Sequence, residues 1–86
     1  MKISAEITLT PLKDNYIPVI KKFIKSLRDL NINILENPMS TQIYGDYDLL
    51  MSLLNKEIKN IFSQEKSIMI NLKLVKGDRS AYKPDF

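Results

Sequence analysis

The sequence predicts an α+β fold, in which a four-stranded antiparallel sheet carries two helices on one face. Polar and apolar residues alternate with a period of two in some segments and of three to four in others. These segments follow one another in the order strand, helix, strand, strand, helix, strand. The length of 86 residues allows one domain with one core, and a hydrophobic content of 44% is ordinary for a globular protein.

The first half of the chain predicts a strand, a helix and a second strand. Residues 2–10 alternate between apolar and polar side chains, which is typical of a half-buried strand. Residues 16–30 carry apolar side chains at the spacing of an amphipathic helix, and Asp14 or Asn15 is available to cap its start. Residues 32–37 then predict a second strand.

The second half predicts two strands around a second helix. Residues 39–44 alternate like a third strand, and Asp46 is placed to cap the helix that follows. This helix is expected over residues 47–62, where one apolar stripe repeats every three to four residues. Residues 67–76 alternate again and predict the last strand.

This order of elements, βαββαβ, is typical of the ferredoxin-like fold. Right-handed crossovers place the first and third strands side by side in the centre, with the second and fourth at the edges. The two helices then cover one face of the sheet. We expect residues 1–80 to form this single domain and residues 81–86 to form a C-terminal tail.

Composition excludes several functional classes. The sequence has no cysteine and no histidine, which excludes disulfides, Cys/His zinc sites, cysteine nucleophiles and Ser-His-Asp triads. We therefore expect no metal and no cofactor, and a cytoplasmic location. No apolar run approaches the roughly 20 residues of a membrane span. The net charge is +3, but the lysines of residues 16–30 lie away from the apolar stripe, which favours a solvated surface over a nucleic-acid site.

Short polar side chains gather on the sheet face that the helices leave uncovered, which we call the open face. Alternation puts Ser4 and Glu6 of the first strand there, beside Ser40, Gln42 and Tyr44 of the third. A solvated sheet face is usually rich in Lys and Glu, whereas this one is rich in hydroxyls and amides. The composition therefore favours a face covered by a ligand or by a partner.

Two alternatives remain open for this face. Alternation turns Met39 and Thr41 toward the helices, but a bulge at Pro38 would bring Thr41 to the open face. The open face could also be an ordinary wetted surface, on which Glu6 and Lys73 form an exposed cross-strand ion pair.

If the face is covered by a ligand, its chemistry favours a cationic or amino-bearing heterocycle. Hydroxyls and amides recognise the donor and acceptor edge of a ring, and the carboxylate of Glu6 attracts positive charge. Met39 and Tyr44 supply apolar contact with a flat ring. An anion is less favoured, because both glycines lie at strand ends and form no glycine-rich phosphate loop.

Three motifs resemble the YkoF-like thiamine-binding family: ISAEITLTPL at residues 3–12, NPMSTQIYGDYDLLM at 37–51 and VKGDRS at 75–80. The resemblance extends nearly end to end and implies a ferredoxin-like domain that forms homodimers or homotetramers through its sheets. It also implies that the protein binds thiamine or its hydroxymethylpyrimidine moiety without catalysis. The positions that match the family's motifs predict these ligand-binding residues: Ser4, Glu6, Asn37, Met39, Ser40, Thr41 and Gln42.

Other functions fit the sequence less well. An enzyme would use Glu6 as a general base, but nothing partners it as an acid or a nucleophile. An RNA-binding domain of this topology needs exposed aromatic residues on its central strands, and only Tyr44 is available. We therefore expect no catalytic residue, no nucleic acid and no membrane as a partner. The main alternative is a homo-oligomeric assembly protein that binds no ligand and packs its open face against a copy.

Overall fold

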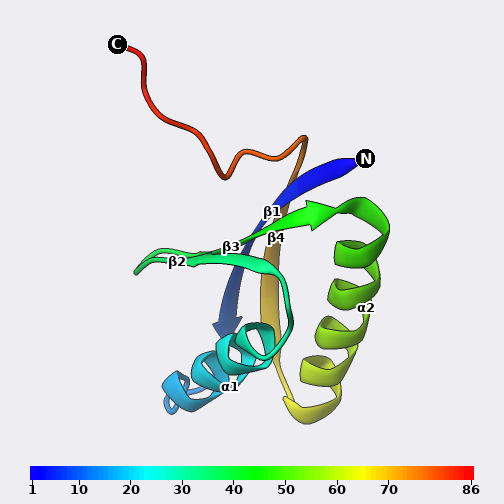
Figure 1. The fold of residues 1–86 in the computed structure, drawn as a ribbon. Coiled ribbons are helices and arrows are strands. Elements are labelled where there is room, and N and C mark those ends of the chain that lie inside the picture. The colour runs from blue at the N-terminus through cyan, green and yellow to red at the C-terminus, as the bar shows by residue number, and fades with distance from the viewer.

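The elements of the computed structural model, which describes residues 1–86, follow the predicted order. Four strands form one sheet in the order β2-β3-β1-β4, and all neighbouring strands are antiparallel. This arrangement confirms the predicted ferredoxin-like α+β fold (Figure 1). The elements are β1 (Lys2–Pro11), α1 (Ile17–Arg28), β2 (Asn33–Glu36), β3 (Thr41–Asp46), α2 (Tyr47–Gln64) and β4 (Ile68–Lys76).

One hydrophobic core lies between the sheet and the two helices. Alternation along β1 sends Ile3, Ala5 and Ile7 to the helix side, where all three are buried. The largest side chains that are fully buried come from both layers, and burying each contributes roughly 1.5–3 kcal/mol to folding. They are Ile7, Leu27, Ile43, Leu50 and Leu54. The core therefore fixes which side of β1 and β3 faces away from the helices.

The helix ends differ from the predicted ones. Helix α1 ends at Arg28, and the N–H of Leu30 bonds to the carbonyl oxygen of Leu27 in a tighter turn. The predicted caps Asp14 and Asn15 are wrong, because the N-cap is Tyr16 and makes no side-chain cap bond. Asp46 is the N-cap of α2 as predicted, but its carboxylate binds no helix N–H and lies 3.6 Å from the N-terminal ammonium.

The connection between β2 and β3 explains why β3 begins later than predicted. Asn37 Oδ1 accepts hydrogen bonds from the backbone N–H groups of Met39 and Ser40, each at 2.9 Å. The N–H of Asn37 also donates to the Ser40 carbonyl oxygen at 3.1 Å. These bonds hold residues 37–40 in a tight turn, so β3 starts at Thr41.

Strand β4 is an edge strand that the helices cover only in part. Ile68 and Ile70 pack against the core, whereas Leu72 and Leu74 are 39% and 45% exposed. Both leucines lie on the helix side, because they pair with Ile7 and Ala5, but α2 packs mainly against β3 and β1. An apolar strip therefore remains exposed along the edge of the sheet.

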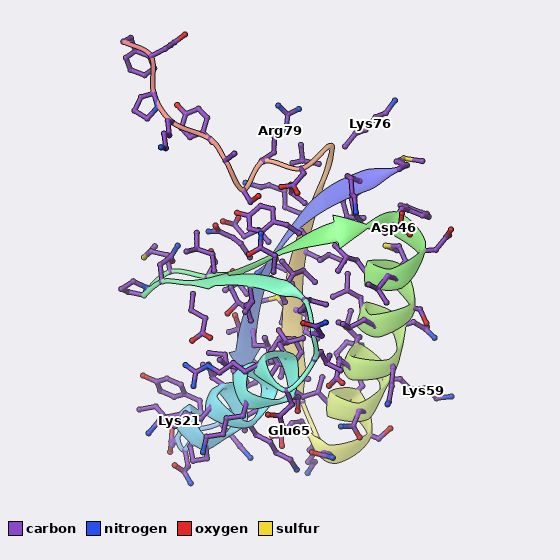
Figure 2. All side chains as sticks on the ribbon, viewed as in Figure 1. Lys21, Asp46, Lys59, Glu65, Lys76 and Arg79 are labelled. Carbon is purple, nitrogen blue, oxygen red and sulfur yellow. The ribbon has the colours of Figure 1, made fainter.

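After β4 the chain turns back over one end of the open face. Gly77 makes this turn with a φ of +96°, a conformation that favours glycine. Residues 81–86 form no helix or strand and run away from the sheet (Figure 1). Figure 2 shows Arg79 at the same end of the molecule as Lys76, opposite to Lys21. Neither helix is long and apolar enough to cross a membrane.

Candidate functional site

Strand register brings the predicted polar residues together on the open face. Glu6 of β1 pairs with Gln42 of β3 on one side and with Lys73 of β4 on the other. Gln42 also pairs with Leu35 of β2, so four side chains form one line across the sheet. We call this line (Leu35, Gln42, Glu6 and Lys73) the central row. Because paired residues share a face, the whole row points away from the helices.

A chain of hydrogen bonds crosses the central row. The Ser40 hydroxyl donates to Glu6 Oε2 at 3.0 Å and accepts from Gln42 Nε2 at 3.3 Å. The Tyr44 hydroxyl donates to Gln42 Oε1 at 2.9 Å. The direction is fixed by Glu6, since an ionised carboxylate only accepts and thereby forces the Ser40 hydroxyl to donate. Ser40 must then accept from the Gln42 amide, which orients that amide.

The polar chain retains free hydrogen-bonding capacity. Gln42 uses one of its two N–H donors and one carbonyl lone pair, so the amide can still both donate and accept. Glu6 Oε1 lies 3.6 Å from Lys73 Nζ, which is a loose contact between exposed groups. A ring with a donor beside an acceptor can therefore bind Gln42 and Glu6 together.

A hollow of about 410 Å³ lies beside this chain of hydrogen bonds. The central-row side chains and Tyr44 form one part of its wall, and residues that follow β4 form another. Among the lining residues, Glu6 is the only acidic one. Three predicted ligand-binding residues line the hollow, namely Ser4, Glu6 and Gln42. The other lining residues were not predicted to bind a ligand: Ala5, Leu35, Tyr44, Lys73, Val75, Arg79, Ser80 and Tyr82.

Ser4 has a structural role at one end of the hollow. Its hydroxyl donates to the Gly77 carbonyl oxygen at 2.8 Å and accepts from the Arg79 N–H at 2.9 Å. The segment after β4 covers Ser4, which is only 7% exposed although it lies on the open face. Ser4 therefore lines the hollow mainly as an anchor for this segment.

Three predicted ligand-binding residues contribute neither to the hydrogen-bonded chain on the open face nor to the hollow beside it. Thr41 is 6% exposed and pairs with Ile7, so it belongs to the helix side and no bulge turns it to the open face. Met39 lies in the turn before β3 and is 82% exposed; it lines a separate hollow of about 180 Å³ together with Ile20 and Ile24 of α1. The Asn37 side chain binds the backbone of that same turn. None of the three lines the hollow.

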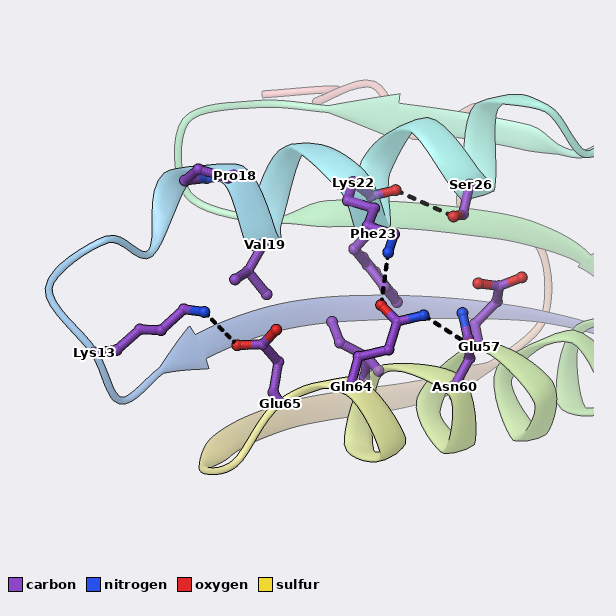
Figure 3. Close-up of a pocket in the computed structure, with 11 residues that line it drawn as sticks. Lys13, Pro18, Val19, Lys22, Phe23, Ser26, Glu57, Asn60, Gln64 and Glu65 are labelled. Atoms are coloured by element: carbon purple, nitrogen blue, oxygen red, sulfur yellow. Dashed lines mark hydrogen bonds and ion pairs between the residues drawn. The ribbon is translucent and has the colours of Figure 1, made fainter.

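A second cavity, of about 220 Å³, lies between the two helices (Figure 3). Buried side chains of Val19, Phe23 and Ile61 line it. Lys22 Nζ donates to Gln64 Oε1 at 2.8 Å, which links the two helices across the cavity. No predicted ligand-binding residue lines this cavity.

Hydrogen bonds shift the pKa values of two carboxyl groups, those of Glu36 and Asp78. No group of three Asp or Glu side chains comes close enough together to hold a metal ion. A side-chain hydrogen bond from Arg28 lowers the pKa of Glu36. Hydrogen bonds from the Ser80 hydroxyl and N–H lower the pKa of Asp78, in the segment that borders the hollow.

A family model described as thiamine-binding protein matches residues 5–81 of this chain. No curated protein matches the chain. The motif resemblance and the family match thus point to the same family.

Several solved structures share the fold. A protein from Streptococcus pneumoniae superposes with a TM-score of 0.84 at 24% identity, covering 94% of this chain and 92% of that one. A Thermotoga maritima protein, provisionally described as a thiamine biosynthesis/salvage protein, superposes with a TM-score of 0.80 at 15% identity. The superposition covers 90% of this chain and 85% of that one. A domain of unknown function from Bacillus cereus superposes with a TM-score of 0.71 at 16% identity, covering 98% of this chain and 84% of that one. At such identities the likeness shows a common fold.

Proposed function

The chain belongs to the thiamine-binding protein family, and on that premise we propose that it binds thiamine, or the hydroxymethylpyrimidine moiety of thiamine, on its open face. The observation that carries the proposal is the hydrogen-bonded chain Tyr44–Gln42–Ser40–Glu6 beside a hollow of about 410 Å³. Its donors and acceptors suit an aminopyrimidine, and its carboxylate suits a cation.

In the proposed complex the aminopyrimidine lies against the central row. Its exocyclic amino group donates to Glu6, and its ring nitrogen accepts from the free N–H of Gln42. Hydrogen bonds to a charged group contribute about 1.5–3 kcal/mol each, so Glu6 is expected to dominate recognition. Leu35, which is about half exposed, provides apolar surface for the ring.

We further propose that the protein catalyses no reaction on this ligand. Glu6 is the only acidic residue at the hollow, so no second carboxyl group is present to act as its acid or base partner. The family description refers to binding. Binding without turnover would suit a protein that carries or senses the vitamin in the cytoplasm.

Calorimetric titration with thiamine tests the proposal. The wild-type chain should bind saturably, and Glu6→Gln should weaken binding roughly ten- to hundredfold because it removes the charge but keeps an acceptor for Ser40. Thiamine at about 100 times its dissociation constant should also stabilise the wild type by ~2.7 kcal/mol.

Glu57→Gln is the matched control, because Glu57 lines the cavity between the helices. It should bind thiamine as the wild type does. Loss of binding in Glu57→Gln with unchanged binding in Glu6→Gln would move the site to the helix side. A wild type that binds neither thiamine nor hydroxymethylpyrimidine at millimolar concentration would contradict the proposal and favour an assembly role alone.

We also propose that copies of the chain assemble through their sheets into a homodimer or a homotetramer. The exposed strip of Leu72 and Leu74 supports this, since it lies on an edge strand whose outer hydrogen-bonding groups have no strand partner. Pairing of two such edges would bury both leucines.

A further inference from the structure

The segment from Gly77 to Tyr82, which we call the return segment, is fastened to the open face rather than loosely attached to it. Ser4 binds both ends of its first turn, through the Gly77 carbonyl oxygen and the Arg79 N–H. Asp78 accepts hydrogen bonds from the N–H and the hydroxyl of Ser80. The N–H of Tyr82 then donates to the Arg79 carbonyl oxygen at 3.1 Å. The Ser4 bonds thus attach the start of the return segment to the sheet, and the other bonds hold its turns between Asp78 and Tyr82.

Tyr82 reaches the same hollow as the central row but makes little contact with the rest of the protein. It lines the hollow together with Glu6, Gln42 and Tyr44, yet it is 73% exposed. An exposed aromatic ring at the wall of a polar hollow has a free face for a second flat group. Phe86, the other aromatic residue of this part of the chain, is fully exposed and does not line the hollow.

Tyr82 also lies just outside the part of the chain that the family model matches. The family model matches residues 5–81 and ends one residue before Tyr82. The central row lies within the match, as does most of the return segment.

We propose that Tyr82 contacts the ligand and that its ring stacks on the positively charged ring of bound thiamine. This inference rests on the proposed function and specifies the orientation of the ligand. Thiamine joins its aminopyrimidine to a cationic thiazolium through one methylene group. With the aminopyrimidine on Glu6 and Gln42, the thiazolium extends along β1 toward Ser4, where the return segment begins.

The spacing of the sheet agrees with this orientation. Glu6 and Ser4 are two residues apart on one strand, so their side chains on the open face are about 7 Å apart. That is close to the separation expected for two rings with a one-carbon link. Ser4 binds the Arg79 N–H directly, which brings the return segment to the second ring.

The chemistry of the hollow supports an aromatic contact for the cation. The face of a phenol ring attracts positive charge, with a strength that increases as the pair is shielded from water. Of the two cations at the hollow, Arg79 donates from its guanidinium to the Lys76 carbonyl oxygen at 3.3 Å, and Lys73 lies 3.6 Å from Glu6, the carboxylate that the ligand's amino group binds. Two aromatic rings line the hollow, and Tyr44 holds Gln42 through its hydroxyl, whereas Tyr82 is 73% exposed and is the ring that we assign to the thiazolium.

The test compares two ligands and three variants by calorimetry. Tyr82→Ala should weaken thiamine binding about five- to thirtyfold, as expected for loss of a cation–π contact. The same variant should bind hydroxymethylpyrimidine like the wild type, because that ligand lacks the thiazolium. Tyr82→Phe should retain the affinity for thiamine, and Phe86→Ala is the control for a change elsewhere in the tail.

The outcomes separate this inference from the proposed function. If the wild type and Tyr82→Ala bind thiamine equally well, the role of Tyr82 is overturned and the proposed function stands. If the wild type binds neither ligand, the proposed function itself fails. If Tyr82→Ala weakens both ligands to the same extent, the proposed orientation is overturned. An unchanged melting temperature of ligand-free Tyr82→Ala shows that the fold is intact.

Discussion

At the scale of single residues, Glu6 has two neighbours that bind it with different strength. Ser40 donates to Oε2 at 3.0 Å, while the ammonium of Lys73 lies 3.6 Å from Oε1 and is largely exposed. An exposed ion pair with this geometry contributes less than about 1 kcal/mol. A cationic ligand at Glu6 therefore competes with Lys73 for the same oxygen.

Lys73→Gln should strengthen thiamine binding by up to about fivefold, because it frees the carboxylate and removes a like charge from the hollow. Lys76→Gln is a matched control, since Lys76 pairs with Ile3 and thus lies on the helix side of the same strand. Calorimetric titration of both variants measures the difference. Weaker binding in Lys73→Gln would mean that the ammonium contacts the ligand directly.

Residue alternation predicted much of the open face but not the roles of all its members. Glu6 and Gln42 lie on the open face, as a period of two predicts. Their neighbours Ile7 and Ile43 are buried against the helices, which sets the orientation of both central strands. Alternation did not predict that Met39 lies in an exposed turn, because the turn bonds of Asn37 end the alternation before β3 begins. Such side-chain-to-backbone bonds have no periodic signal in the sequence.

At the scale of elements, two hydrogen bonds between Asp78 and Ser80 stabilise one turn of the return segment. Two hydrogen bonds from Ser80 lower the pKa of Asp78 in the folded chain. A lowered pKa means that this turn is stabilised above the unfolded pKa and loses that stabilisation as the pH falls through the folded pKa. The hydrogen bonds between Asp78 and Ser80 should therefore persist at neutral pH and weaken only at acidic pH.

Amide hydrogen exchange or NMR of Ser80 across a pH series from 6 to 2 tests this expectation. The Ser80 N–H should stay hydrogen-bonded until the pH falls below the ordinary pKa of an aspartate and should then become mobile. Asp78→Asn, which keeps an oxygen acceptor but removes the charge, should abolish the pH dependence of the Ser80 protection factor and N–H chemical shift. A Ser80 signal that changes near neutral pH in the wild type would contradict the account.

The elements themselves were predictable because each has one clear period. The strand and helix order, the strand neighbours and the helix-covered face all follow from apolar spacing and right-handed crossovers. The return segment was not predictable, because its position depends on Ser4, more than 70 residues away in the chain. Tyr82 was missed for the same reason, as nothing local links it to the sheet.

At the scale of the whole molecule, the exposed edge of β4 predicts association between copies. Leu72→Lys together with Leu74→Lys should shift the protein toward the monomer, because two charges would face each other across the paired edges. Leu49→Lys is the control, since Leu49 is an exposed leucine on α2. Analytical ultracentrifugation measures the change. A wild type that is monomeric at all concentrations would contradict assembly through this edge.

The proposed function places thiamine in the hollow on the open face of the sheet and not in the cavity between the helices. A crystal structure of the protein grown with thiamine distinguishes them most directly. We predict ligand density on the open face, with the aminopyrimidine in hydrogen-bond contact with Glu6 and Gln42. Density confined to the cavity between α1 and α2, or an empty open face at saturating thiamine, would contradict the central claim.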